Sequence, residues 1–204
     1  MSPHTHTPLL CSQVGFTSWA SAREPAQVFE LLEEIYASFD RVAKKGKVFK
    51  VETIGGKHKC VYMLRSVLPQ VFSQAIFYPS TTDCYMAASG LPEERKDHAA
   101  VMAKFARECL LQLHRVLRRL EVTLGPETSD LGLRVGIHTG PVTAGVLRGE
   151  KARFQLFGDT VNTAARMEST GKKNKIQVSA ETAAAISAAN QKQIWTVPLS
   201  LIHI

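Results

Sequence analysis

The segment FGDTVNTAARMESTG (residues 157–171) carries the side chains best suited to chemistry. Its pattern predicts a helix that Asp159 caps, and Asn162 and Arg166, four residues apart, then project from the same face. A neutral amide orients sugar oxygens, and a guanidinium neutralises charge on phosphoryl oxygens. The pair therefore suits a phosphate ester that reacts near a ribose. The alternative is an asparagine and an arginine on a solvated helix face.

Hydrophobic periodicity predicts the helices that support this segment. Residues 23–45, with Pro25 in a first-turn position, and residues 97–120 each carry one apolar stripe at steps of three and four. The expected inward residues are Val28, Leu32, Ile35, Phe39 and Val42 in the first helix and Val101, Phe105, Cys109, Leu113, Val116 and Leu120 in the second. We expect a last helix at 180–190.

Five segments have the β-branched and aromatic content of strands. They are residues 48–54, 83–92, 131–147, 154–158 and 175–179, the third folding into two strands about the turn HTGP. The composition of LGPETSD, which follows the second helix, predicts a loop. Strand pairs that alternate with helices indicate an α+β fold, a mixed sheet covered by helices.

The composition is typical of a globular domain: 204 residues, 45% hydrophobic and 21% charged. No apolar run reaches the roughly 18–20 residues that cross a bilayer. The four cysteines form no CxxC pair, which indicates reduced thiols in an intracellular compartment. The net charge is +7, but no aromatic residues are interleaved with the basic ones. We therefore expect a solvated basic face, or attraction for phosphate-bearing small molecules, and no binding of nucleic acid.

Residues 157–171, with LRVGIHTGPVTAGV before them and KIQVSAET after them, resemble the catalytic domain of class III nucleotidyl cyclases, the adenylyl and guanylyl cyclases. VGFTSWASAREPAQVFELLEEIYASFD and KVFKVETIG…DCYMAASGLP resemble the same family in the same order. The resemblance covers about residues 14–55 and 83–197. It implies a ferredoxin-like βαββαβ core and conversion of a nucleoside triphosphate to a 3′,5′-cyclic monophosphate and pyrophosphate.

The resemblance also implies a site shared between two catalytic domains. One domain holds two Mg²⁺ or Mn²⁺ ions with two aspartates, and the other supplies the asparagine and arginine. By resemblance, Asn162 orients the ribose, Arg166 stabilises the transition state and Asp83 is the second metal aspartate. The first metal aspartate falls on Ser12, in LLCSQVGFT. A serine hydroxyl is a poor ligand for a hard divalent ion, so we expect at most a partial metal site.

The same resemblance assigns recognition of the nucleotide's base, guanine or adenine, to two residues. Glu52 stands where guanylyl cyclases carry a glutamate, and a carboxylate accepts hydrogen bonds from both guanine donors. Gln155 stands at the second base-recognition position, where its amide donates to guanine O6 but also serves adenine. We therefore favour GTP, with ATP as the alternative.

The resemblance has three breaks, which set the domain boundaries. We expect a non-homologous tail at 1–13, a cyclase domain at 14–198 interrupted by 56–82, and a truncated end at 199–204. The middle segment has no acidic residue and no helical or strand period. We interpret it as an intron translated into protein, because its two ends permit splice-donor and splice-acceptor codons. A real insertion is the alternative.

Two functions follow. The first is a cyclase catalytic domain in signal transduction, forming cyclic GMP or cyclic AMP as a homodimer or a cyclase-domain heterodimer. The second is a catalytically inactive, cyclase-like domain that dimerises and binds nucleotide. We expect a cytoplasmic domain in either case, and any membrane region of the full-length protein would lie outside this chain.

Overall fold

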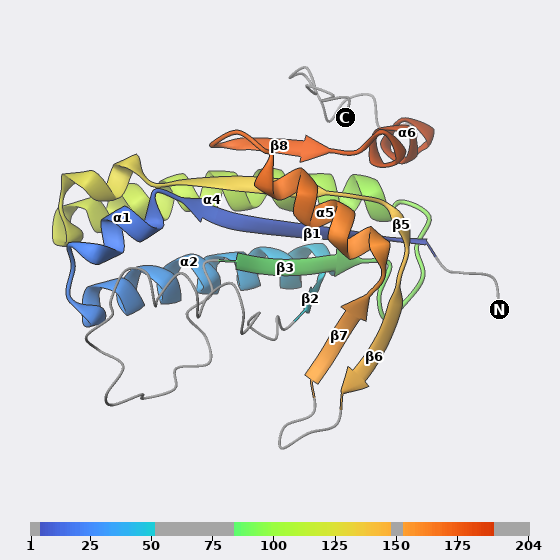
Figure 1. Ribbon diagram of the computed structural model, residues 1–204, viewed down its shortest axis with the longest axis horizontal. Helices are drawn as coiled ribbons and strands as arrows, with labels where there is room; N and C mark the ends of the chain where they lie inside the picture. The colour runs from blue at the N-terminus through green and yellow to red at the C-terminus, as the bar shows by residue number, and fades with distance from the viewer. Residues whose placement is uncertain (1–4, 52–83, 148–152, 190–204) are drawn as a thin grey trace.

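The computed structural model describes residues 5–51, 84–147 and 153–189 (Figure 1). Glu52 and Asp83, two of the predicted site residues, lie outside this part of the chain, as do Cys60 and the segment 56–82. No helix in the described ranges is long and apolar enough to cross a membrane.

One mixed sheet organises the molecule. Its strands run in the order β2 (Phe49–Val51), β3 (Cys84–Ser89), β1 (Thr5–Val14), β4 (Gly132–Ile137) and β8 (Lys175–Val178). The first four pair antiparallel, and β8 runs parallel to β4. With α2 (Pro25–Gly46) between β1 and β2, and α4 (His98–Leu124) between β3 and β4, this is the predicted ferredoxin-like βαββαβ core.

The remaining elements are additions to that core. They are α1 (Phe16–Ser21), the 3-10 helix η1 (Pro126–Asp130), β5 (Gly140–Pro141), the hairpin of β6 (Thr143–Leu147) and β7 (Arg153–Phe157), α5 (Asp159–Ser169) and α6 (Ala180–Ala188). Figure 1 shows α2 and α4 together on one face of the sheet and α5 crossing the other face.

The main core fills the space between the sheet and the two long helices. The predicted stripes are confirmed: in α2 the residues Leu32, Ile35 and Phe39 are buried, while Val28 and Val42 pack at the edge. In α4 the predicted positions from Phe105 to Leu120 are all buried, and Val101 is partly buried. This burial raises the pKa of the Cys11 and Cys109 thiols and so keeps them protonated.

A second, smaller apolar cluster occupies the opposite face, beneath α5 and the hairpin. Its buried members are Val51, Met86, Ala88 and Leu156. The Phe49 and Phe154 rings meet edge to face with centroids 4.7 Å apart, which fastens the β6–β7 hairpin to β2. Aromatic packing thus holds β7, which carries Gln155, against the sheet.

The structure differs from the sequence predictions at five points. Residues 131–147 form three strands rather than two, because β5 (Gly140–Pro141) lies within the expected turn. Residues 5–13, which we set apart from the domain, form most of the central strand β1, and its apolar middle, Pro8 to Cys11, suits a strand buried on both faces. Helix α1 had no predicted counterpart. Residues 126–130 form a 3-10 helix rather than a loop. Gly158, with φ +127°, is the N-cap of α5, and Asp159 is its first residue.

Gln13 is a misfit in this central strand. It shares the helix-covered face of β1 with Leu9 and Cys11, which belong to the main core, and it is only 6% exposed. Neither its amide nitrogen nor its amide oxygen has a hydrogen-bond partner among the described residues. A buried amide without partners destabilises the folded state by about 1–3 kcal/mol.

Replacing Gln13 with leucine should therefore raise the stability of the protein by about 1–3 kcal/mol, measured by urea unfolding. Gln177 provides the matched control, since it is similarly buried at 7% exposure but donates to the Thr170 Oγ1 at 2.9 Å. Gln177→Leu should lower stability. Equal changes in stability from the two substitutions would contradict the conclusion that the buried Gln13 amide lacks partners.

Candidate active site

The position of α5 is fixed by a close approach to β4. A methyl group added at Gly136 would lie 2.5 Å from the Ala164 carbonyl oxygen and would run into the backbone nitrogen of Glu168. The inward face of α5 consists of Thr160, Ala164 and Met167, spaced four and three residues apart, as expected for a helix lying on a sheet. The helix backbone therefore rests almost directly on the strand.

The outward face of α5 presents Asn162 and Arg166. Both side chains are exposed, and neither forms a hydrogen bond or an ion pair with another described residue. Because they lie one helical turn apart on the same face, an amide and a guanidinium are offered side by side to a ligand or a second protein domain. The predicted pair is thus brought together by the structure.

Ser12 has the opposite environment. It lies on the α5 face of β1, 7% exposed, with Cys84 and Arg134 as its register partners on the two neighbouring strands. Its hydroxyl donates a hydrogen bond to the Glu168 carboxylate and accepts one from Arg134 Nη2 at 3.2 Å. The Arg134 Nε donates to the same carboxylate oxygen at 2.9 Å. We call these three residues the Ser12 cluster.

Sequence reasoning missed the other two members of this cluster. Arg134 and Glu168 both occur in the quoted motifs, and each carries a signal. Arg134 is a charged residue inside the apolar strand GLRVGI, and Glu168 lies near the end of a short helix. A half-buried charge on a strand requires a partner of opposite charge, and only the fold identifies that partner.

Only one of the two metal positions that the resemblance implies, that of Ser12, lies among the described residues, which contain no group of three histidine, cysteine or acidic side chains that could hold a metal ion. The Ser12 hydroxyl is already hydrogen-bonded, and the Arg134 guanidinium beside it repels a cation. The charges of Arg134 and Glu168 cancel, so the Ser12 cluster offers no net negative charge.

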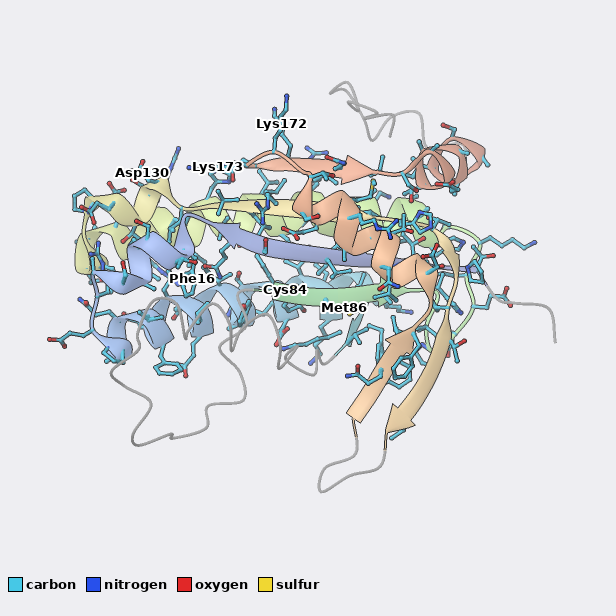
Figure 2. All side chains as sticks on the ribbon, viewed as in Figure 1. Phe16, Cys84, Met86, Asp130, Lys172 and Lys173 are labelled. Atoms are coloured by element: carbon cyan, nitrogen blue, oxygen red, sulfur yellow. The ribbon has the colours of Figure 1, made fainter. Side chains whose placement is uncertain are left out.

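Gln155 lies on β7, partly exposed, opposite Gly145 in the hairpin. Its neighbour Phe154 packs on Phe49 of β2, and β2 ends at Val51, immediately before Glu52. The strand that carries Gln155 thus packs against β2, which ends one residue before the predicted position Glu52 (Figure 2, where Cys84 and Met86 mark the adjacent β3).

Comparisons with known proteins agree with this architecture. The sequence model of the family described as adenylate and guanylate cyclase catalytic domain matches residues 5–77 and 80–200. The receptor-type guanylate cyclase gcy-28 of Caenorhabditis elegans is 41% identical over 169 residues, 83% of this chain and 11% of that protein. The guanylate cyclase soluble subunit beta-2 of Rattus norvegicus is 36% identical over 86% of this chain and 21% of its own length.

Solved structures give the same result. The guanylate cyclase domain of RhGC from Catenaria anguillulae, in complex with GTP, has a TM-score of 0.68 and 28% identity, covering 98% of this chain and 89% of that chain. The guanylyl cyclase Cya2, at 21% identity and a TM-score of 0.71 over 90% of this chain and 78% of that chain, supports the fold. The chain belongs to the adenylate and guanylate cyclase catalytic domain family. It spans about a tenth to a quarter of the curated relatives' length.

The close approach at Gly136 predicts that Gly136→Ala destabilises the protein by about 1–3 kcal/mol, because α5 must move away from the sheet. Gly145→Ala is the control, since a methyl group there meets nothing within 4 Å. Thermal unfolding of the two variants measures the difference. A Gly136→Ala protein as stable as the Gly145→Ala protein would show that the helix does not depend on this contact.

The ion pair of Arg134 and Glu168 should matter more than the exposed one between Arg119 and Glu34. The Glu168 side chain is 12% exposed, whereas the Arg119 and Glu34 side chains are 59% and 42% exposed. We expect Arg134→Gln to cost about 1–3 kcal/mol and Arg119→Gln less than about 1 kcal/mol in urea unfolding. Similar losses would mean that the Ser12 cluster adds no stability of its own.

Proposed function

We propose that this domain takes part in the cyclisation of GTP to cyclic GMP and pyrophosphate, in a site shared with a second cyclase domain. The observation that carries the proposal is the paired, exposed Asn162 and Arg166 on α5, in a chain of this family. The named relatives gcy-28 and the soluble subunit beta-2 are guanylate cyclases, which favours GTP over ATP.

In the reaction, the ribose 3′-oxygen bonds to the α-phosphorus, its proton is lost, and the bond to the pyrophosphate oxygen breaks. Negative charge grows on the phosphoryl oxygens as the leaving group departs. The Arg166 guanidinium stabilises that charge by hydrogen bonds that strengthen in the transition state. The Asn162 amide holds the ribose so that the 3′-oxygen lies in line with the leaving group, which lowers the entropic part of the barrier.

The base would lie against β7, where Gln155 donates its amide N–H to guanine O6, and Glu52 would accept from guanine N1 and its 2-amino group. Adenine offers a lone pair at N1 where guanine offers a hydrogen, so a carboxylate there disfavours ATP. We place the domain on the cytoplasmic side of the cell, in a longer protein with further domains.

The Ser12 cluster favours a second candidate function, a cyclase-like domain that binds nucleotide and dimerises without turnover. Such a domain would keep the Asn162 and Arg166 face and would lack a metal-holding half. The two candidates predict different behaviour when a carboxylate is restored at position 12.

The test is Ser12→Asp in the full chain, assayed with GTP or ATP and Mn²⁺ for cyclic nucleotide. We expect cyclic GMP in excess of cyclic AMP, and a loss of about 100-fold or more when Arg166→Ala is added, because a transition-state contact is removed. Ser187→Asp, which adds the same charge on the exposed face of α6, should form none. A Ser12→Asp protein that forms no cyclic nucleotide would refute the cyclase function.

A further inference from the structure

A row of buried polar side chains crosses the sheet near the start of β1, away from the Ser12 cluster. It links two histidine rings through four hydroxyl groups, and its members in order are His98, Thr7, Thr139, Thr182, Ser179 and His138. The successive distances between their polar atoms are 2.6, 3.0, 3.0, 3.2 and 2.7 Å. The four hydroxyl-bearing residues are between 0% and 8% exposed. We call these six residues the hydroxyl row, which ties β1, α4, α6 and the turn between β4 and β5 together.

The hydroxyl row transmits the protonation state of His98, because each hydroxyl has a single proton to donate. When His98 is neutral, its Nδ1 accepts a hydrogen bond from Thr7. The hydrogen bond that Thr182 donates to Thr139 points in the same direction. A charged His98 has no acceptor nitrogen and must donate to Thr7 instead, so the threonine hydroxyls turn around and point toward Ser179.

The Ser179 oxygen limits how much charge the hydroxyl row can hold. A hydroxyl oxygen has two lone pairs, and one of them accepts from the Thr182 backbone N–H at 3.3 Å. The other lone pair can accept from the His138 ring or from a reversed Thr182 hydroxyl, but not from both. The Ile137 carbonyl oxygen, 3.5 Å from Thr182 Oγ1, is too far away to be a good substitute. The row therefore accommodates one charged histidine and not two.

His138 is the ring that we expect to take the first proton. Burial lowers the pKa of His138, and the carboxylates of Glu181 and Asp159 partly offset that effect. The Glu181 carboxylate lies 3.6 Å from His138 Nδ1, beyond hydrogen-bond distance, so it attracts the charge without replacing Ser179 as the acceptor. A charged His138 therefore keeps its hydrogen bond to Ser179.

His98 takes a proton less readily. Burial lowers the pKa of His98, and the neighbouring His6 lowers it further. Of the other charged groups that face the ring, Arg95 opposes a positive charge, while Asp97 and Glu94 favour one. Arg95 also donates two hydrogen bonds to the Asp97 carboxylate, at 2.7 and 3.0 Å, which weakens the attraction of that carboxylate for the ring.

The turn that the hydroxyl row holds also supports α5. Thr139 leads directly into β5, which pairs with the start of β1. The Pro141 carbonyl oxygen in β5 accepts a hydrogen bond at 2.5 Å from the Oγ1 of Thr160, in the first turn of α5. A change that loosens this turn therefore also loosens the start of the helix that carries Asn162.

We propose that the hydroxyl row is a pH-sensitive latch, which holds α6 and the β4–β5 turn against the sheet while at most one of His98 and His138 is charged. The latch opens when acid drives protons onto both rings. Because burial lowers both pKa values, the folded state binds fewer protons than the unfolded state. The stability that the row contributes is therefore complete above the ordinary histidine pKa of 6.5 and is lost as the pH falls below it. The inference goes beyond the cyclase function and does not depend on it.

Urea unfolding at two pH values tests the latch. From about pH 7.5 to about pH 5.5, the unfolding equilibrium constant of wild type should rise about tenfold more than that of the double variant His98→Asn, His138→Asn. An asparagine amide can replace the ring Nδ1 in each hydrogen bond but does not titrate. His114→Asn is the control and should keep the pH dependence of wild type, since His114 is exposed on α4 and contacts only its own helix through Nδ1. A variant that is less stable at every pH still gives the comparison.

Proton NMR of the histidine rings tests whether the two ends are coupled through the hydroxyls. In His138→Asn, the proton affinity of His98 should rise about threefold or more, because Ser179 no longer has to accept from a charged ring. Adding Thr182→Val removes the central hydroxyl with little change of shape, and this rise should then vanish. A rise that survives Thr182→Val would show direct repulsion between the rings and would overturn the coupling at Ser179.

Hydrogen exchange shows which element is released. At about pH 5.5, after correction for the intrinsic exchange rate, the protection of the α6 amides should fall about tenfold relative to that of the α2 amides. Helix α2 is the internal reference, since it contains no histidine. Protection that falls equally in α2 and α6, or an unfolding equilibrium whose pH dependence is the same in wild type and the double variant, would overturn the latch.

Discussion

The contact of α5 with the sheet is the constraint on which the rest of the structure depends. At Gly136 the helix backbone comes so near to β4 that no side chain fits between them. Two turns of helix are then held in one register by Thr160, Ala164 and Met167 on the apolar side and by Glu168 at the end. Because both its distance from the sheet and its rotation about its own axis are fixed, the helix presents its outward residues in one defined direction.

The same contact links the two chemically distinct faces of the domain. Glu168 points inward to Arg134 and Ser12, while Arg166, two residues earlier, points outward. Residues two apart on a helix lie on roughly opposite sides, so one short segment serves both structure and candidate chemistry. A charged residue on the inner side is tolerated because a strand supplies a cation at 2.9 Å.

The sequence predicts much of this arrangement because its signals are local. The periodicity of α2 and α4 and the Asn162 and Arg166 spacing depend only on the helical repeat, and the structure confirms them. The Ser12 cluster could not be predicted, since its members are separated by 122 and 156 positions in the chain. Strand β1 was missed for a related reason: a strand buried on both faces lacks the alternation that identifies a strand. The placement of Glu52 and Asp83 stays a prediction.

The end of β1 shows where sequence and fold disagree, and the disagreement is confined to adjacent positions. From Pro8 to Cys11 the strand is mainly apolar and packs on both faces, in agreement with its central place. Gln13 then places an unpaired amide in the main core, and Ser12 places a hydroxyl where the family's resemblance expects a carboxylate. Ser12 contacts α5 on its inward side, through the hydrogen bond to Glu168, while the outward face of the helix stays open. The departure from the family's pattern is therefore confined to the end of one strand, while the helix that carries Asn162 and Arg166 keeps its close packing on β4.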